Sequence, residues 1–565
     1  MNSRNLSYCI VISRPLSAHG PQEQGLRHGM IIAILNTAEP FQEDEIMSKR
    51  TISNQSLLEL LRHKPSSRVF KQLEDLGEIP AVLPLLSWSF NEPFTRQAQE
   101  AVTAICKRAA PHRLLWLANA LHCAHHPGLT SFWRDLTPYY WAHFEDDIVA
   151  RARLCFAGLR SCHRNGYLRE GAVKELERIE NGDEIPWLLM RINDNVEPIR
   201  RRAEFAVRCR MVPAYAPHLT RWLPHVFHLE SCLGKNHQQF MDHIRFWLAG
   251  HSRTLIKGLE LNDYRTRRLC LDLLYQRKSG LDEVLSKAMA DGCLTHRLQA
   301  LAQAEKRGLA DHFIWDLALK NGASVVRIRA LHHLLKIRSE KAESALAEAL
   351  MDRLPGVRFF ARLHLQRSFG WTGFTAHYRQ YLPTDRNGVA LDGFAECGLS
   401  IDVDDVLPYL HSDNPSTRAG ALGAVAQLAP ERGLDHFQAA LSSGNAQVFK
   451  QGIKALQDNP DFLFPAALGE ALKHTASPIQ AVQLIGLLEK TERWSRLTTL
   501  VGLWDREGKV GHLIRDHLQE WVFRGGVPWQ SLKPEKTVKR RLVHLLQQGG
   551  SRASAILKHL ELEED

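Results

Sequence analysis

Imidazole and thiol side chains crowd the stretch ALHCAHHPG at 120–128, within about one and a half turns of a helix. These side chains are His122, Cys123, His125 and His126. Neutral imidazole and thiolate are the ligands that Zn²⁺ prefers in proteins. A smaller group that could complete a site if the chain folded back comprises Cys155, Cys162 and His163. Neither group has zinc-finger spacing, so we expect ordinary buried or surface histidines here and nominate no metal ligand.

The familiar catalytic and nucleotide-binding motifs do not occur in the sequence. There is no G-x-x-x-x-G-K-[ST] phosphate loop, no G-x-S-x-G nucleophile elbow and no strand that leads into a glycine-rich dinucleotide turn. We therefore nominate no catalytic residue and no cofactor. An enzyme would need a pocket assembled from distant parts of the chain.

The composition favours a cytoplasmic protein that does not insert into a membrane. The 565 residues are 44% hydrophobic and 24% charged, and no apolar run approaches the roughly 18 residues that a membrane span requires. Ten cysteines are scattered without a C-x-x-C pair, a pattern typical of reduced, buried thiols rather than of a disulfide scaffold.

A helical pattern recurs along the chain at an interval of roughly 30 residues. Its anchor positions are Arg267, Arg297, Arg327 and Arg358, followed by Gly388, Arg418 and Phe449. Small or apolar residues stand three, four and seven positions after most anchors, which is the spacing of one face of an α-helix. Weaker copies start near Thr95, Arg151, Arg200 and His237.

Shorter helical segments lie between these copies, so each repeat is predicted to be a helical hairpin. A single hairpin cannot bury its apolar face, and neighbouring hairpins must stack to share a core. We therefore expect an all-α, right-handed superhelix. Its expected parts are an N-terminal extension or start-site artefact at 1–46, irregular repeats at 47–259, a regular array at 260–495 and a C-terminal helical cap with a basic segment at 496–565.

Three segments resemble HEAT-like repeats, in particular the short type of the phycobilin lyases, whose second helix opens with Asp, Pro, Val and Arg. The segments are NDNVEPIRRRAEFAV (193–207), DRLPGVRFFARLHL (352–365) and SDNPSTRAGALGAV (412–425). With weaker copies, the resemblance covers about four-fifths of the chain. It implies an armadillo-like superhelix and says almost nothing about activity.

The resemblance also implies a structural role for the anchor arginines. In such repeats the arginine at the start of the inner helix binds an acidic or amide group in a neighbouring turn and ties successive units together. The expected ladder residues are Arg267, Arg297, Arg327, Arg358 and Arg418, with Asp291, Asn321 and Asp352 as partners.

Positive charge is concentrated in the middle of the chain, where residues 196–368 hold 29 Lys and Arg against 17 Asp and Glu. Residues 385–435 are acidic instead, with nine acids and three bases. Several bases stand at offsets that should point away from the apolar seam and could form a stripe for a phosphate backbone or an acidic protein segment. The expected stripe is Arg201, Arg202, Arg208, Arg268, Arg329, Lys336, Arg362 and Arg367.

These features favour a non-catalytic scaffold or adaptor that holds a protein partner on its concave and charged surfaces. The alternative is a nucleic-acid-binding protein that grips phosphates with the basic stripe. A third hypothesis is a repeat-fold enzyme, either metal-dependent or similar to the helical-repeat DNA glycosylases.

Overall fold

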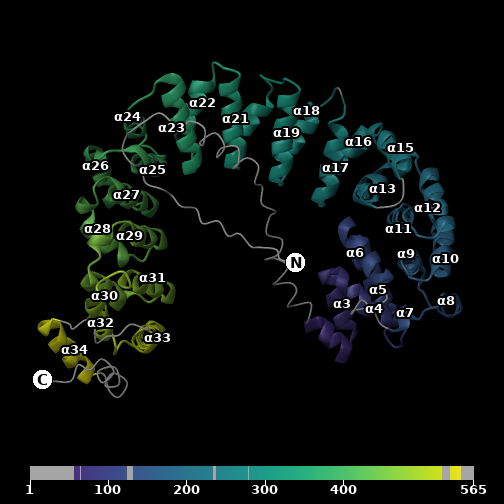
Figure 1. Cartoon of the computed structure of the whole chain (residues 1–565), viewed down its shortest axis with the longest axis horizontal. Coiled ribbons are helices and arrows are strands. Elements are labelled where there is room, and N and C mark those ends of the chain that lie inside the picture. The colour runs from purple at the N-terminus through teal and green to yellow at the C-terminus, as the bar shows by residue number, and fades with distance from the viewer. Residues whose placement is uncertain are drawn as a thin grey trace. The chain divides into compact units, whose positions relative to one another are not determined.

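A computed structural model gives the structure of the chain (Figure 1). It describes residues 56–63, 65–123, 131–232, 237–277, 279–524 and 535–548. The predicted extension at 1–46, together with His125 and His126, lies outside these residues. No helix in the described ranges combines the length and apolarity that a membrane crossing requires.

The described residues are helical, and within them no β-strand occurs. The helices up to residue 319 are, in order, α3 Ser67–Leu76, α4 Val82–Trp88, α5 Thr95–Arg108, α6 Pro111–His122, α7 Ser131–Arg134, α8 Pro138–Phe144, α9 Arg153–Ser161, α10 Gly166–Leu176, α11 Ile185–Arg191, α12 Glu197–Cys209, α13 Ala216–Arg221, α14 Leu223–His228, α15 Gln238–Ala249, α16 Ser252–Gly258, α17 Tyr264–Leu274, α18 Asp282–Ala290, α19 Leu294–Lys306 and α20 Ile314–Leu319. The later helices are α21 Ser324–Lys336, α22 Ala342–Ala349, α23 Pro355–Phe369, α24 Phe374–Arg379, α25 Asn387–Cys397, α26 Val403–Val406, α27 Pro415–Leu428, α28 Leu434–Leu441, α29 Ala446–Asp458, α30 Pro465–His474, α31 Pro478–Leu488, α32 Arg493–Val501, α33 Gly508–Arg524 and α34 Lys536–Gln548. Short 3₁₀ segments are η1 Ile79–Ala81, η2 Ala150–Ala152, η3 Pro213–Tyr215, η4 Leu229–Ser231, η5 Ser400–Asp402, η6 Leu407–His411, η7 Pro430–Arg432 and η8 Pro460–Phe462.

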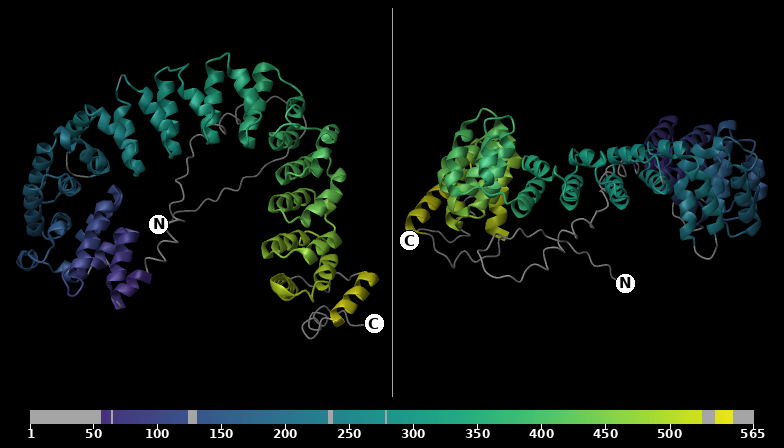
Figure 2. Two further views of the ribbon diagram at one scale, coloured as in Figure 1. Left: turned by 180° about the vertical axis from the view of Figure 1, so that it is seen from behind. Right: turned by 90° about the horizontal axis from the view of Figure 1, so that it is seen from above.

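The chain divides into two compact units, with the boundary between Ala318 and Leu319. Each unit is built of paired helices, and in the first unit α14 also packs on α6. In the second unit α25, α27, α29 and α31 pack side by side in one layer, and α28, α30 and α32 form the other (Figures 1 and 2). The predicted all-α, HEAT-like fold of stacked helical hairpins is confirmed.

Helix α21 shows how the repeated pattern produces this packing. It spans Ser324–Lys336, and its buried positions include Val326, Ala330, Leu331 and Leu334, at spacings of three and four. A stripe with this spacing lies along one face of a helix and is covered by α22 and α23. The anchor helices are therefore the second, inner helices of their hairpins.

Small residues let the inner helices of the second unit approach closely. Helix α27 carries Gly420 and Gly423, and a side chain at Gly423 would collide with Gln451 of α29. On the other side, a side chain at Gly420 would come within 3.4 Å of Leu391 in α25. Packing this close leaves eight of the fourteen residues of α27 buried, which explains its Ala-rich and Gly-rich sequence.

Helix α34 lies at the C-terminal end of the described chain and belongs to the predicted basic cap. It places Leu542, Val543 and Leu546 against α32, while Lys536 and Arg540 stay exposed. This is the arrangement expected of a helix that shields the last apolar face of an array. The predicted limits at 260 and 495 mark where the repeats become regular in sequence. The boundary at 318 separates two compact units and is a different kind of boundary, so it does not test those limits, which stay predictions.

Candidate protein-docking face and the arginine braces around it

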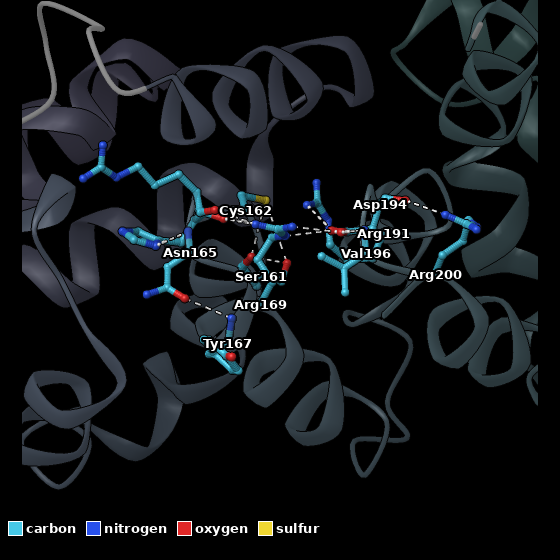
Figure 3. Close-up of polar contacts among 12 residues, drawn as sticks. Ser161, Cys162, Asn165, Tyr167, Arg169, Arg191, Asp194, Val196 and Arg200 are labelled. Atoms are coloured by element: carbon cyan, nitrogen blue, oxygen red, sulfur yellow. Dashed lines mark hydrogen bonds and ion pairs between the residues drawn. The ribbon is translucent and has the colours of Figure 1, made fainter. Parts of the chain in front are cut away.

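The best-formed polar site of the first unit joins α10 to the loop before α12 (Figure 3). Arg169 donates from Nε and Nη2 to the two carboxylate oxygens of Asp194, at 2.8 and 2.9 Å. Its Nη1 donates to the backbone oxygens of His163 and Arg164, six and five residues earlier. Arg191 adds a contact of 3.1 Å to the same carboxylate. Both Arg169 and Asp194 are buried, so this ion pair is fully bidentate and shielded from water.

The same geometry recurs in two predicted ladder residues. Arg267 binds both carboxylate oxygens of Asp291, at 2.7 and 3.1 Å, and Arg327 binds both of Asp352, at 2.6 and 2.7 Å. Each arginine also donates to backbone oxygens six and five residues earlier, as Arg169 does. The aspartate stands 24 or 25 residues after its arginine, just before the next inner helix. Each of these arginines therefore links two consecutive repeats.

The remaining ladder residues keep a backbone contact, but no aspartate stands at the matching position of the next repeat. Arg358 instead reaches Asp392 of α25, at 3.5 Å. Arg358 donates to the backbone oxygen of Asp352 at 2.7 Å and turns its guanidinium to Glu396 in α25. Arg418 donates to the backbone oxygens at 412 and 413, and Arg297 donates to that of Gly292. No carboxylate is available one repeat after Arg418, because the corresponding position is Ser443.

We call these arginine side chains, which join consecutive repeats, braces. They lower the pKa of the aspartates that they bind. Burial by itself would raise the pKa of Asp194, but Arg169, the backbone N–H of Val196 and Arg191 lower it below its ordinary value. The pKa of Asp291 is lowered in the same way, because Arg267 and the N–H of Cys293 outweigh burial. Both acids are therefore charged at neutral pH.

Arg169 was not among the predicted anchors. The weaker copy was expected near Arg151, but Arg151 lies in the 3₁₀ segment η2, and the inner helix of that repeat is α10 with Arg169. The available signal was the spacing of 31 residues from Arg169 to Arg200, together with Asp194 six residues before Arg200. Arg200 in turn donates to the backbone oxygen of Asp194 at 3.0 Å.

A second set of braces closes the other end of the inner helices. At the end of α12, Arg210 donates to the backbone oxygens of Glu177 and Ile179 after α10, at 3.0 and 2.6 Å. Arg307 reaches Arg277 in the same way at 2.9 Å, and Asn459 reaches Ala426 at 3.1 Å. Arg108 makes a matching contact to Glu74. In the other layer of the second unit, Arg506 after α32 reaches Thr475 at the end of α30. Each brace satisfies carbonyl groups that a helix C-terminus leaves open.

The histidines and cysteines weighed as metal ligands occupy different environments: His122 and Cys123 are exposed, whereas Cys155, Cys162 and His163 are buried. His163 is buried, with Nε2 2.7 Å from the carbonyl oxygen of Trp133 and Nδ1 accepting from the N–H of Asn165 at 3.0 Å. Burial lowers its pKa to about 4. Cys162 is also fully buried, and burial raises its pKa. In the described ranges no group of three or more His, Cys, Asp or Glu side chains could hold a metal ion.

The residues of the predicted basic stripe occupy different environments. Arg201, Arg202 and Arg208 are ion-paired with Glu197, Glu177 and Glu204. Arg268, Lys336 and Arg367 are exposed, and Arg329 is half-buried with a partner of its own.

Arg362 differs from the expectation that it points away from the apolar seam. Its side chain is only 12% exposed and binds Glu396 at 2.7 Å and the hydroxyl of Tyr378 at 3.0 Å. The unpredicted acid on α25 and the buried tyrosine on α24 draw this side chain inward.

Two phenylalanines are exposed on α12 and α15 in the first unit. Phe205 of α12 is 62% exposed and Phe246 of α15 is 81% exposed. Arg208 links the two helices, because its Nη1 donates to Nδ1 of His243 at 2.8 Å and its guanidinium lies 5.4 Å from the ring centre of the buried Phe240. We define the docking face as Phe205, Phe246, Arg201, Arg208 and His243. Sequence reasoning missed it, since a phenylalanine in an inner helix is ordinarily a core residue.

Comparison with known proteins gives no relative by sequence. No family model matches the chain. No curated protein matches it either.

Several solved structures resemble the chain at low sequence identity. One is importin beta, with 13% identity and a TM-score of 0.29, covering 94% of this chain and 66% of that one. Kap95p with RanGDP gives 12% identity and a TM-score of 0.26, covering 93% and 64%, and Kap121p bound to Pho4p gives 13% and 0.20, covering 95% and 53%. The chain thus spans less than two thirds of the length of these proteins. At such low TM-scores we conclude nothing about this chain from the likeness. The fold assignment depends on the helix pairs and braces described above.

Proposed function

We propose that the protein is a helical-repeat scaffold that holds a protein partner on the docking face of its first unit. The observation that carries this proposal is the exposure of Phe205 and Phe246 on two linked helices. Covering a phenylalanine side chain contributes about 1.5 to 3 kcal/mol, so leaving two of them in water is costly unless a partner covers them. Aromatic side chains surrounded by arginine are the usual anchors of protein interfaces.

The charge of the face indicates the chemistry of the partner. Arg201 is 79% exposed and shares α12 with Arg202 and Arg208, in the part of the chain where bases outnumber acids. A partner segment with carboxylates beside apolar side chains would bind the arginines at the rim while covering the two phenylalanines. Such complementarity steers the encounter and sets the orientation of the partner.

Affinity capture with the native protein tests the proposal. The full chain is tagged in its host and captured with and without nuclease, next to a Phe205→Ser/Phe246→Ser variant. We expect a protein partner that resists nuclease and is lost with the double variant. Ile479→Ser is the matched control, because Ile479 is 74% exposed but lies on α31 of the second unit.

Two results would contradict the proposal. Capture that disappears with nuclease would favour the nucleic-acid alternative, whose exposed candidates are Arg201, Arg202, Arg268, Lys336 and Arg367. A double variant that folds and captures the same protein as the wild type would show that the docking face is not the binding surface.

A further inference from the structure

Helices α21 and α23 of the second unit carry no acidic residue. Their sequences, SVVRIRALHHLLK and PGVRFFARLHLQRSF, hold six Lys and Arg side chains and no Asp or Glu. The two helices pack against each other as neighbouring inner helices. Their combined surface is therefore positive unless acids of other elements offset its charge.

Acids of other elements offset only part of this charge. Three of the six bases bind carboxylates, and Arg329 has a partner of its own. The three bound bases are Arg327 with Asp352, Arg358 with Asp392 and Glu396, and Arg362 with Glu396. Lys336 and Arg367 are exposed, and in the part of the chain that the structure describes neither forms an ion pair. These two bases are available to a partner.

Positive groups also meet at the seam between the two helices. Burial lowers the pKa of His364 on α23, and the positive charges of His332 on α21 and of Arg367 lower it further. The three side chains therefore lie close enough to repel one another when they are charged. A carboxylate brought to this seam by a partner would relieve that repulsion.

Apolar side chains lie beside these bases. Phe359 of α23 is 62% exposed. Ile328 occupies the same position on α21, since each of the two follows the anchor arginine of its helix, and Leu363 lies one turn after Phe359. Both aliphatic side chains are half-buried. An exposed aromatic ring beside aliphatic side chains and available bases is typical of a protein interface.

A nucleic acid fits this surface less well than a protein does. A protein that grips a phosphate backbone makes on the order of six to ten phosphate contacts. Only Lys336 and Arg367 are available here, and a phosphate backbone would not cover the aliphatic side chains next to them.

We infer that α21 and α23 bind a protein segment in which acidic side chains stand beside apolar ones. The binding surface, which we call the α21–α23 face, consists of Ile328, Phe359, Leu363, Lys336 and Arg367. Apolar side chains of the partner cover Phe359, and its carboxylates bind Arg367 and Lys336. Phe359 and Arg367 are eight residues apart on one helix, about 12 Å along its axis. An extended segment covers this distance in about three or four residues, which sets the spacing between its apolar and acidic positions.

Selection from a library of random peptides displayed on phage tests the inference on the full chain. The informative peptides are those that bind the wild type and are lost with Phe359→Ser. We expect Asp and Glu to be enriched in these peptides, about three or four positions from a large apolar residue. The most enriched peptide is then synthesised with a fluorescent label, and its affinity is measured by anisotropy.

Variants connect this affinity to the α21–α23 face. Phe359→Ser should weaken the peptide about tenfold or more, because covering a phenylalanine is worth at least that factor. Lys336→Glu/Arg367→Glu should weaken it about tenfold, since attraction becomes repulsion at two positions, and added salt should weaken binding to the wild type. The matched controls in the same unit are Phe464→Ser, at a side chain that is 45% exposed, and Lys450→Glu/Lys454→Glu, at exposed positions of α29.

Three results would overturn the inference. The first is a selection in which no peptide depends on Phe359. The second is a peptide whose binding is unchanged by Lys336→Glu/Arg367→Glu. The third is an oligo(dT) strand or a DNA duplex that binds the wild type, loses binding with this charge reversal and displaces the peptide, which would assign the surface to nucleic acid.

The inference does not rest on the docking face of the first unit. The Phe205→Ser/Phe246→Ser variant should bind the selected peptide like the wild type, so either proposal can fail without the other.

Discussion

At the scale of single residues, the buried pair of Arg169 and Asp194 is the strongest brace in the first unit. Its two charges are shielded from water and satisfied by two parallel hydrogen bonds and by backbone oxygens. Such a pair adds little over an apolar substitute, but removing one partner leaves the other charged and buried. Removing either partner of this brace should therefore destabilise the first unit.

Asp194→Asn should destabilise the first unit by about 3 to 5 kcal/mol, because Arg169 and Arg191 would then be buried without a carboxylate. Denaturant unfolding followed by circular dichroism measures the change. Asp413→Asn is the control, since the Asp413 side chain is exposed and only its backbone oxygen meets Arg418. A loss below about 1 kcal/mol for Asp194→Asn would contradict the assigned role.

Buried histidines should make the first unit sensitive to acid. His225 is buried, with Nε2 2.8 Å from the carbonyl oxygen of Pro111, and burial lowers its pKa to about 4. Between the ordinary value of 6.5 and about 4 the unfolded chain takes up a proton that the folded chain refuses. Stability therefore falls as the pH decreases through this window.

Between pH 7 and pH 5, the His225→Gln variant should lose about 2 kcal/mol less unfolding free energy than the wild type, because glutamine does not titrate. Unfolding free energies of the variant and the wild type at the two pH values give this difference. His143→Gln, at an exposed position, serves as the control and should leave the pH dependence as it is. An unchanged pH dependence in His225→Gln would mean that His225 does not contribute.

At the scale of helices, glycines mark where inner helices meet their neighbours most closely. A side chain at Gly452 of α29 would come within 2.7 Å of the Cβ atom of Ala440 in α28. Gly486 in the interior of α31 has nothing within 4 Å of its would-be Cβ atom. The two glycines differ in packing although both lie inside helices.

Replacing each glycine by alanine should therefore have opposite effects on the second unit. Gly452→Ala should destabilise it by about 1 to 3 kcal/mol through overpacking. Gly486→Ala should stabilise it by about 0.5 to 1 kcal/mol, because alanine favours the helix and meets open space. Thermal and denaturant unfolding of the two variants gives the signs, and equal signs would contradict this account of the packing.

How much of the molecule the sequence predicts depends on whether a feature repeats. The helix pairs and the contacts of Arg267 and Arg327 follow from a pattern that returns every 30 residues or so. The docking face and the position of Arg362 depend on residues that occur once and on partners such as Glu396 and His243. A single occurrence has no period, so only the folded arrangement identifies it.

At the scale of the whole molecule, stability should be local. In a repeat array most contacts join neighbouring repeats, although in the first unit α14 also packs on α6. A defect should therefore spread mainly to the helices that it touches. Asp194→Asn should speed amide hydrogen exchange in α9 to α12 and leave exchange in α25 to α31 at the wild-type rate. Mass spectrometry of exchanged peptides checks this, and faster exchange throughout both units would show that the chain unfolds as one cooperative body.

The braces also restrict how such a chain can change in length. An inner helix brings its own arginine, and the aspartate that receives it belongs to the next repeat. Duplicating one complete repeat therefore preserves the existing pairs, whereas an insertion of one or two residues inside an inner helix would rotate the arginine away from its aspartate by about 100° per residue. The arginine–aspartate pairs therefore permit the array to lengthen by whole repeats. Smaller insertions are tolerated in the connecting loops, where they do not rotate an inner helix.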